Sequence, residues 1–292
     1  MNSFKLRIID KFQNLSIKEL LETFHFSKSK IYLLNNENAF FVNQKNVDEN
    51  YILNLNDLLE IELNEKIDLQ PIETNLEIAY EDDYYLIVNK PRDILVHDDG
   101  NGKITLNNLV AGYYKSHHIR RKIRSCNRLD YETTGLVIYA KDPISEASMN
   151  YMILERQIEK KYYALCENRF SKKEGIIDLP IARNRHDSQK MIVNKNGKEA
   201  KTYFKVLVNG SISLVDITLL TGRTHQIRVH LNYINHPLIG DKLYGNGKNL
   251  PLLLQSYSLR FCSPFTNKEI LITISMDSLF KKYMEVLNDK RA

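Results

Sequence analysis

The pair Asn209 and Gly210 constrains the fold of this chain most tightly, because it stands between two strand-like runs, residues 203–208 and 213–219. Asn-Gly fits the left-handed positions of the tight turn that joins neighbouring antiparallel strands. A second Asn-Gly, at residues 196 and 197, predicts another hairpin just before the first. Strands that come in hairpins argue against a doubly wound parallel sheet and favour a mixed, largely antiparallel one.

The rest of the larger part of the chain fits such a sheet. Two short apolar runs, residues 86–88 and 135–140, predict strands buried on both faces. Asp142 and Pro143 predict the start of a helix, because Asp can cap free N–H groups and proline fits the first helical turn. We therefore expect residues 76–292 to form one α+β domain with a central sheet and flanking helices.

Residues 1–63 are expected to form a small α/β module of their own. Ser16 and Glu19 have the spacing of a capping box, which predicts a short helix, and Ser27 is expected to cap a second one. The remaining signals are two strand-like runs and a charged, proline-containing linker: residues 39–42, 58–63 and 64–75.

The charge of the chain is only mildly basic, with 41 Lys and Arg against 36 Asp and Glu. Its distribution is more informative, because five basic residues crowd into ten positions: Lys115, Arg120, Arg121, Lys122 and Arg124. Such a cluster attracts phosphate without a large total charge.

No sequence signal indicates a membrane or a metal. The longest apolar runs, such as residues 250–254, are far shorter than the roughly 20 residues that cross a bilayer, and the first residues lack the pattern of a signal peptide. We therefore expect a cytoplasmic protein. The three cysteines are isolated, and His225 and His230 are five residues apart with no acidic residue between them, so we expect no metal site.

Three segments carry residues suited to chemistry, and the first is residues 127–135, NRLDYETTG. An acidic residue just before a strand is most often a turn former. Here Arg128 can hold the carboxylate of Asp130 ionised, and Gly135 allows another backbone to approach closely. A charged carboxylate at a rigid strand end suits nucleophilic or electrostatic work at a carbon atom.

The second segment, residues 160–165, reads KKYYAL and is predicted to be a strand. Alternation places Lys161 and Tyr163 on one face and Tyr162 on the other. A tyrosine here can simply be half buried, or it can stack on a nucleobase and offer its hydroxyl for proton transfer. The spacing leaves both alternatives open.

The third segment, residues 221–230, reads TGRTHQIRVH and turns from a strand into a helix. Free N–H groups and the helix dipole favour anions at such an N-terminus. A well-capped surface helix would carry the same pattern as a site for phosphate or carboxylate, so both remain open for its four polar residues: Arg223, His225, Gln226 and Arg228.

In this order, the segments resemble the RluA-type pseudouridine synthase family across nearly all of residues 76–292. The matching stretches are NKP at 89–91, RLDYETTGL at 128–136, KKYYA at 160–164 and GRTHQIRVH at 222–230, continued by HP, GD and YG up to residue 245. The sequence departs from the family pattern at Asn127, Thr134, Gln255 and Ser256, but none of these changes removes a catalytic group.

The resemblance implies that Asp130 is the catalytic aspartate, that Arg223 is its ion-pair partner, and that Tyr162 stacks on the uracil. Isomerisation of uridine involves no redox change and no group donor, so we expect no cofactor. The residues expected to contact RNA are Lys90, Arg120, Arg121, Lys122, Arg124, Arg128, Lys160, His225, Gln226 and Arg228.

Residues 1–63 resemble the S4 RNA-binding domain that precedes the catalytic domain in part of this family. The resemblance predicts an enzyme acting on structured RNA, with large-subunit rRNA favoured over tRNA. The sequence does not indicate an oligomeric state, so a monomer is the default expectation. A non-catalytic RNA-binding or ribosome-assembly factor is the main alternative. It does not explain Asp130 inside a basic segment, because a bare carboxylate weakens phosphate binding.

An aspartate-dependent glycosidase is a third alternative. It would need a second carboxylate, for which Glu132 is the nearby candidate.

Overall fold

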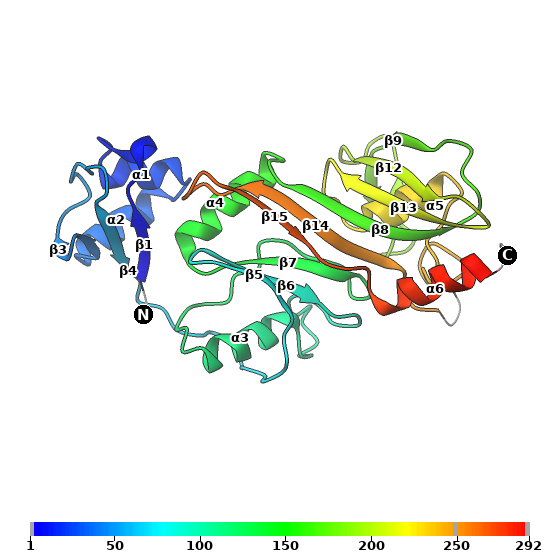
Figure 1. Cartoon of the computed structure of the whole chain (residues 1–292), viewed down its shortest axis with the longest axis horizontal. Coiled ribbons are helices and arrows are strands. Elements are labelled where there is room, and N and C mark those ends of the chain that lie inside the picture. The colour runs from blue at the N-terminus through cyan, green and yellow to red at the C-terminus, as the bar shows by residue number, and fades with distance from the viewer. Residues whose placement is uncertain (1–2, 248–249, 290–292) are drawn as a thin grey trace.

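The N-terminal module, defined here as residues 3–63, is a four-stranded antiparallel sheet with two short helices. We describe residues 3–247 and 250–289 of a computed structural model, in which this module lies at one end of an elongated molecule (Figure 1). The strand order is β1-β4-β2-β3. Its elements are β1 (Ser3–Arg7), α1 (Ile17–Thr23), α2 (Lys28–Asn36), β2 (Phe40–Val42), β3 (Lys45–Asn46) and β4 (Leu58–Glu62).

The predicted capping box at the start of α1 is confirmed. The Ser16 hydroxyl accepts a hydrogen bond from the backbone N–H of Glu19 at 3.2 Å, and the Glu19 carboxylate accepts one from the N–H of Ser16 at 2.8 Å. Ser27 caps α2 as expected, since its hydroxyl accepts from the N–H of Lys30. Both helices therefore begin where local side-chain chemistry predicts.

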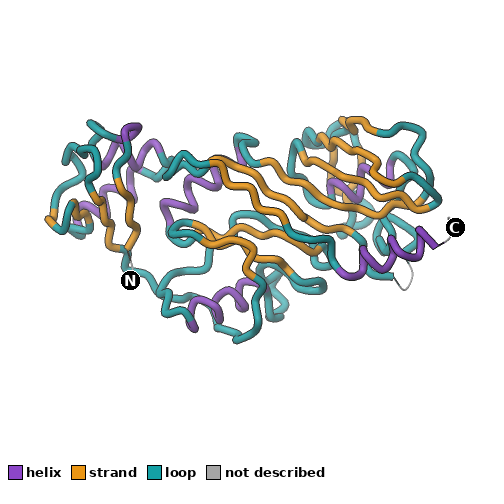
Figure 2. Tube along the Cα trace, viewed as in Figure 1, coloured by secondary structure: helices purple, strands orange, loops and turns teal. Residues whose placement is uncertain are grey.

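A nine-stranded sheet organises the rest of the described chain (Figure 2). The strand order is β5-β6-β7-β14-β8-β13-β12-β9, with β15 paired to the far part of β14. Among the described strands only the β7–β14 pair is parallel, which confirms the predicted mixed, largely antiparallel sheet. The strands are β5 (Ile78–Glu81), β6 (Tyr85–Lys90), β7 (Thr134–Ala140), β8 (Glu159–Glu167), β9 (Glu174–Asp178), β12 (Lys201–Val208), β13 (Ile212–Leu219), β14 (Leu254–Cys262) and β15 (Glu269–Thr273).

Within residues 64–247 and 250–289, this sheet is accompanied by four helices, labelled in Figure 1, and by a small hairpin. Asp142 caps α4 and Pro143 opens it, as the sequence predicts. The helices are α3 (Leu106–Ser116), α4 (Pro143–Leu154), α5 (Gln226–Tyr233) and α6 (Ser278–Asp289), and the hairpin is β10 (Ile181–Arg183) with β11 (Met191–Val193).

One of the two predicted hairpins is correct and the other is wrong. Asn209 and Gly210 lie between the paired strands β12 and β13. Asn196 and Gly197 do not join β11 to β12, because β11 pairs with β10 and Lys198 pairs with Ile181. The second turn therefore returns the chain toward β10, and β12 pairs with β9 instead.

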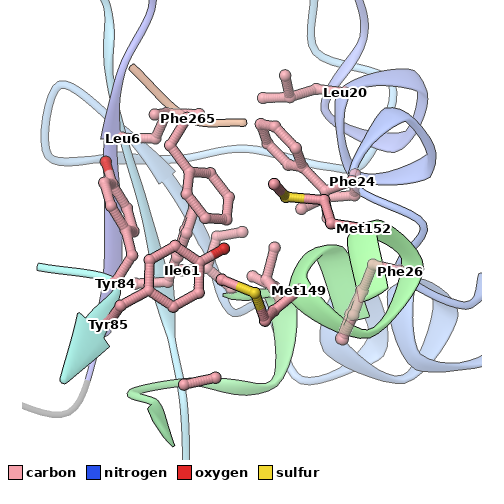
Figure 3. Packing of buried hydrophobic residues seen from close by; sticks show 14 of the residues in the cluster. Leu6, Leu20, Phe24, Phe26, Ile61, Tyr84, Tyr85, Met149, Met152 and Phe265 are labelled. Carbon is pink, nitrogen blue, oxygen red and sulfur yellow. The ribbon is translucent and has the colours of Figure 1, made fainter. Parts of the chain in front are cut away.

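The N-terminal module shares a hydrophobic core with the larger sheet (Figure 3). Phe265, from the β14–β15 connection, is almost fully buried between the two units. Its ring centroid lies 4.2 Å from that of Tyr84, 4.7 Å from Phe24 and 5.6 Å from Phe4. The two units are thus packed together by aromatic contacts as well as joined by the chain.

Polar contacts also form near this junction. They involve Arg121 and Arg124, so the prediction that these two residues contact RNA is wrong. Arg121 is buried and donates to the backbone carbonyls of Ser3 and Lys141. Arg124 is buried as well and forms ion pairs with Glu65 and Glu146. Arg121 therefore joins Ser3 of the module to the catalytic domain, whereas Arg124 joins Glu65, just after the module, to Glu146 on α4. Neither side chain faces solvent.

We predict that Phe265→Ala destabilises the protein strongly. Removing a buried phenylalanine typically lowers the free energy of unfolding by about 3–5 kcal/mol, which corresponds to a fall in Tm of roughly 10 °C for a chain of this size. Leu271→Ala, in the adjacent strand β15, is the control because Leu271 is 63% exposed. Thermal unfolding of both variants tests the shared core, which is contradicted if the two melt alike.

Candidate active site

Asp130 lies in the loop directly before β7, and a glycine fixes the course of that loop. Gly135 has φ +113°, and a Cβ there would lie 2.0 Å from the carbonyl oxygen of Ser256. Only glycine fits a left-handed conformation and such a close backbone approach. Gly135 therefore lets β7 pair with β14 at the point where the chain leaves the Asp130 loop, as its predicted role requires.

Lys90 anchors the Asp130 loop from inside the protein. Its Nζ donates to the carbonyl oxygens of Pro91 at 3.0 Å, Ile94 at 2.8 Å and Tyr131 at 3.0 Å. The residue is fully buried, and burial lowers the pKa of its ammonium to about 7. The prediction that Lys90 contacts RNA is therefore wrong, since its three N–H donors bind backbone carbonyls.

Arg92 also binds the Asp130 loop. Its Nη1 donates to the carbonyl oxygen of Glu132 at 3.0 Å, and its Nη2 pairs with Asp277 at 3.1 Å. Asp277 also accepts a hydrogen bond from the Thr134 hydroxyl at 3.2 Å. Lys90 and Arg92 together bind the backbone at Tyr131 and Glu132, immediately after Asp130.

The guanidinium beside Asp130 belongs to Arg228, which corrects the predicted pairing with Arg223. Arg228 Nη1 lies 3.3 Å from Asp130 Oδ2. Arg223 Nε donates instead to the carbonyl oxygen of Glu199 at 2.8 Å. Arg228 was predicted to contact RNA, but it is 4% exposed and its charge is used inside the protein.

A second carboxylate, Asp241, fixes Arg228 in a two-pronged ion pair. Arg228 Nε and Nη2 donate to the two carboxylate oxygens of Asp241 at 2.9 and 2.8 Å. Burial acts against the charge of Arg228, but the hydrogen bonds and charge of Asp241, helped by Asp130, outweigh it and raise the pKa above its ordinary value. The guanidinium is thus rigidly held and permanently charged beside Asp130.

Tyr162 lies on β8 and faces the same cavity as Asp130. The side chain is almost fully buried, and burial, with the nearby charge of Asp130, raises the pKa of its hydroxyl to about 12. The phenol is therefore neutral at physiological pH. Its ring is available as an apolar surface on one side of the cavity.

Asp130, Tyr162 and Arg223 line one small cavity of about 70 Å³. Arg223 also lines a larger groove of about 960 Å³, and Lys160 lines that groove too. Lys160 is half-buried and forms no ion pair or side-chain hydrogen bond with any residue in 3–247 or 250–289. The small cavity is sized for part of a base, and the groove is large enough for a strand.

The remaining predicted site residues separate into surface and interior groups. Gln226 is buried and binds Thr221, Lys201 and Thr202 within the turn before α5, so its predicted RNA contact is wrong. His225 is partly buried, and its Nε2 lies 3.8 Å from Asp130 Oδ2. Three other predicted RNA contacts are exposed, and they are Arg120, Lys122 and Arg128.

Several site residues were not predicted from the sequence. Arg92 and Asp277 pair with each other across most of the chain, and Asp241 pairs with Arg228 in the preceding helix. One signal was available for Asp241: a buried arginine on the apolar side of a helix needs an acidic partner. Thr133 lines the cavity, and its buried hydroxyl has no hydrogen-bond partner among the described residues.

Two kinds of feature do not occur in the described part of the chain. Within residues 3–247 and 250–289, no three His, Cys, Asp or Glu side chains are grouped so that they could hold a metal ion. Over the same residues, no helix has the length and apolar character that a bilayer-crossing helix needs.

Comparison with known proteins gives the same family that the motifs suggested. The RNA pseudouridylate synthase family matches residues 84–233. An uncharacterized RNA pseudouridine synthase of Bacillus subtilis, YhcT, is 37% identical over 72% of this chain and 71% of its own length. Ribosomal large subunit pseudouridine synthase C of Buchnera aphidicola (subsp. Schizaphis graminum) is 32% identical over 96% of this chain and 93% of its own.

Among solved structures, human RNA pseudouridylate synthase domain containing 1 superposes with a TM-score of 0.60 at 26% identity, over 69% of this chain and 83% of that one. The sheet described above is therefore the fold of that protein as well. The fold, the motifs and these matches agree, and the chain belongs to the RNA pseudouridylate synthase family and is an isomerase.

Proposed function

We propose that this chain converts specific uridines of large-subunit ribosomal RNA to pseudouridine, with Asp130 as the catalytic carboxylate. The observation that carries the proposal is the Asp130–Arg228 ion pair at a cavity lined by Tyr162. Similarity to a relative named ribosomal large subunit pseudouridine synthase C supports the choice of RNA, because it extends over 96% of this chain, N-terminal module included.

The reaction is an internal rearrangement. The bond between C1′ of the ribose and N1 of uracil breaks, the base turns, and C1′ bonds to C5, which loses its proton while N1 gains one. Nothing is oxidised or reduced, and every atom of the product except exchanged protons comes from the substrate. We therefore propose that the protein needs no cofactor for this step.

Each cavity residue has a role in this proposal. Asp130 acts on the nucleoside as a carboxylate, and the guanidinium of Arg228 lies beside it and fixes its orientation. Tyr162 stacks on the uracil once the base has left its helix, an interaction of about 1–3 kcal/mol per base. Unstacking the base costs a few kcal/mol, so this stacking offsets much of that cost.

The groove next to the cavity is the proposed path of the RNA strand. Lys160 and Arg223 line it, and Arg128 lies exposed on the rim of the cavity. Burial lowers the pKa of Lys160, but the side chain has no acidic partner among the described residues and can therefore pair with a phosphate. Arg120 and Lys122 face solvent at the junction with the N-terminal module, where we propose that they contact a more distant part of the RNA.

For the N-terminal module, we propose an S4-like RNA-binding role in a monomeric, cytoplasmic enzyme. Exposed Lys28 and Lys30 on α2 support it. Acidic residues outnumber basic ones within residues 1–63. We therefore expect most phosphate contacts to come from the catalytic domain, with the module orienting the RNA by shape.

Mapping pseudouridines in total RNA, with and without this protein, tests the proposed substrate. Carbodiimide adducts that survive alkali stop reverse transcription at pseudouridine, so each site appears at nucleotide resolution. We expect at least one large-subunit rRNA site to disappear when the protein is absent and to return when purified protein acts on the unmodified transcript. Sites confined to tRNA would reject the rRNA assignment, and RNA binding without any new pseudouridine would reject the activity.

A further inference from the structure

His225 and Tyr244 form a hydrogen-bonded pair beside Asp130 that the mechanism above does not use. His225 Nδ1 lies 2.8 Å from Tyr244 Oη, and His225 Nε2 lies 3.8 Å from Asp130 Oδ2. The rings of the two residues meet edge to face, with centroids 5.6 Å apart. Tyr244 also lies under the guanidinium of Arg228, at 5.3 Å. The pair therefore contacts both members of the Asp130–Arg228 ion pair.

The hydrogen bonds of Tyr244 decide which nitrogen of His225 carries the proton. The Tyr244 oxygen accepts the backbone N–H of Met191 at 2.7 Å. Its own O–H then needs an acceptor, and His225 Nδ1 is the acceptor within reach. The opposite arrangement would leave this O–H without an acceptor among the described residues. A neutral His225 that accepts at Nδ1 carries its proton on Nε2, which faces Asp130.

The imidazole of His225 is held in this place by a strained backbone conformation. His225 has φ +55° and ψ 19°, the left-handed conformation, directly before α5. Non-glycine residues seldom adopt it, and such positions concentrate at functional sites. The Gln226 side chain binds the N–H of Arg223 and the carbonyl of Lys201, which fixes the turn on both sides of His225.

We infer that His225 is a positioning residue: its Nε2–H, set by Tyr244, holds Asp130 Oδ2, the oxygen that Arg228 also contacts, and leaves Oδ1 free for the substrate. Asp130 Oδ1 has no hydrogen-bond partner among the described residues. The 3.8 Å separation is longer than a hydrogen bond, and catalytic hydrogen bonds in ligand-free proteins often shorten when substrate binds. The inference rests on the proposed role of Asp130.

The charges around His225 favour a neutral ring. Burial lowers its pKa, Asp130 and Asp241 act in the raising direction, and Arg228 and Arg128 act in the lowering direction. These are the charged groups that face the ring from the Asp130 loop, from α5 and from the loop that carries Tyr244. A neutral ring is the form in which the choice of nitrogen matters.

The first experiment reads the tautomer directly in the free protein and does not depend on activity. Long-range 15N–1H correlation spectra of 15N-histidine-labelled protein distinguish Nε2–H from Nδ1–H, with His225→Leu used to assign the signal. We expect Nε2–H in the wild type and a mixture of both tautomers in Tyr244→Phe. A wild-type spectrum with the proton on Nδ1 would overturn the inference.

The second experiment separates positioning from RNA binding. His225→Leu is expected to lower kcat by about 10- to 100-fold, the range for losing one hydrogen bond to a charged group, with Kd for the RNA within about twofold. His225→Gln retains an N–H donor near the position of Nε2 and is expected to restore kcat to within about fivefold of wild type. Equal losses in the Leu and Gln variants, or no loss in either, would overturn the inference.

The wild-type arm distinguishes this inference from the proposed function. If wild-type protein forms no pseudouridine in any RNA, the proposed function fails, and the tautomer spectrum still tests the Tyr244–His225 pair. If wild-type protein is active and His225→Leu is equally active, the proposed function stands and the positioning role fails.

Discussion

Asp130→Asn is expected to lower the rate of pseudouridine formation by about a thousandfold or more, the scale on which enzymes lose activity with an essential acid, base or nucleophile. The amide has the shape of the carboxylate but no negative charge. Asp130 is partly exposed at the cavity, so the fold should survive the change. RNA affinity should stay the same or rise, because a negative charge near the phosphates is removed.

Glu132→Gln is the matched control for this variant. It makes the same chemical change two residues away, in a carboxylate that pairs with exposed Lys242 at 2.8 Å. We expect near wild-type rates from Glu132→Gln, measured as pseudouridine formed per minute on the mapped rRNA transcript. Comparable losses of activity in both variants would instead show that a second carboxylate takes part in the reaction.

Arg228→Met is expected to remove most activity and to destabilise the protein as well. Methionine fills similar space but leaves the fully buried Asp241 without its cation and Asp130 without its anchor. Breaking a buried ion pair by removing one partner typically lowers the free energy of unfolding by about 3–5 kcal/mol. Chemical denaturation and single-turnover rates measured on the same preparation give both effects.

A second substitution separates stability from catalysis at Arg228. Asp241→Asn keeps an acceptor for the backbone N–H groups of Leu243 and Tyr244 but removes the buried charge. The double variant Arg228→Met, Asp241→Asn should therefore recover stability while remaining inactive. Arg223→Met should stay folded and mainly weaken RNA binding. The assignment of the ion pair to Arg228 is wrong if Arg223→Met loses the chemical step and Arg228→Met retains it.

Local sequence patterns were sufficient for the parts of this protein that depend on neighbouring residues. Ser16 with Glu19, and Asp142 with Pro143, mark helix starts because capping involves residues three or fewer positions apart. The Asn-Gly pair at 209 and 210 correctly marked the connection between β12 and β13. Neither residue has the positive φ that the predicted tight turn requires, and the Asn209 side chain instead binds the backbone of Phe170. Asp130 could be singled out because an acidic residue in a basic segment weakens phosphate binding and so needs another explanation.

Local patterns could not show which arginines form ion pairs inside the protein, because their partners are brought close only by the tertiary fold. Arg223 and Arg228 belong to one motif, and only the fold shows that Arg228 meets Asp130 and Asp241. The sequence did contain a signal that Arg228 is buried. Arg228 lies three residues before the apolar Leu231, and residues at this spacing share one side of a helix, here the packed side. In the sequence, Arg121 and Arg124 look like part of a phosphate-binding cluster. In the structure they form ion pairs with three acidic residues from other parts of the chain: Asp142, Glu65 and Glu146.

The role of Asp130 is tested most directly by following the proton that leaves C5 during one turnover. RNA transcribed with uridine tritiated at C5, and incubated with enzyme in excess, releases one tritium to water for each uridine isomerised. We predict that wild-type protein releases one equivalent per target site and that Asp130→Asn, bound to the same RNA, releases none. Release by Asp130→Asn at the wild-type rate would contradict a catalytic role for this carboxylate.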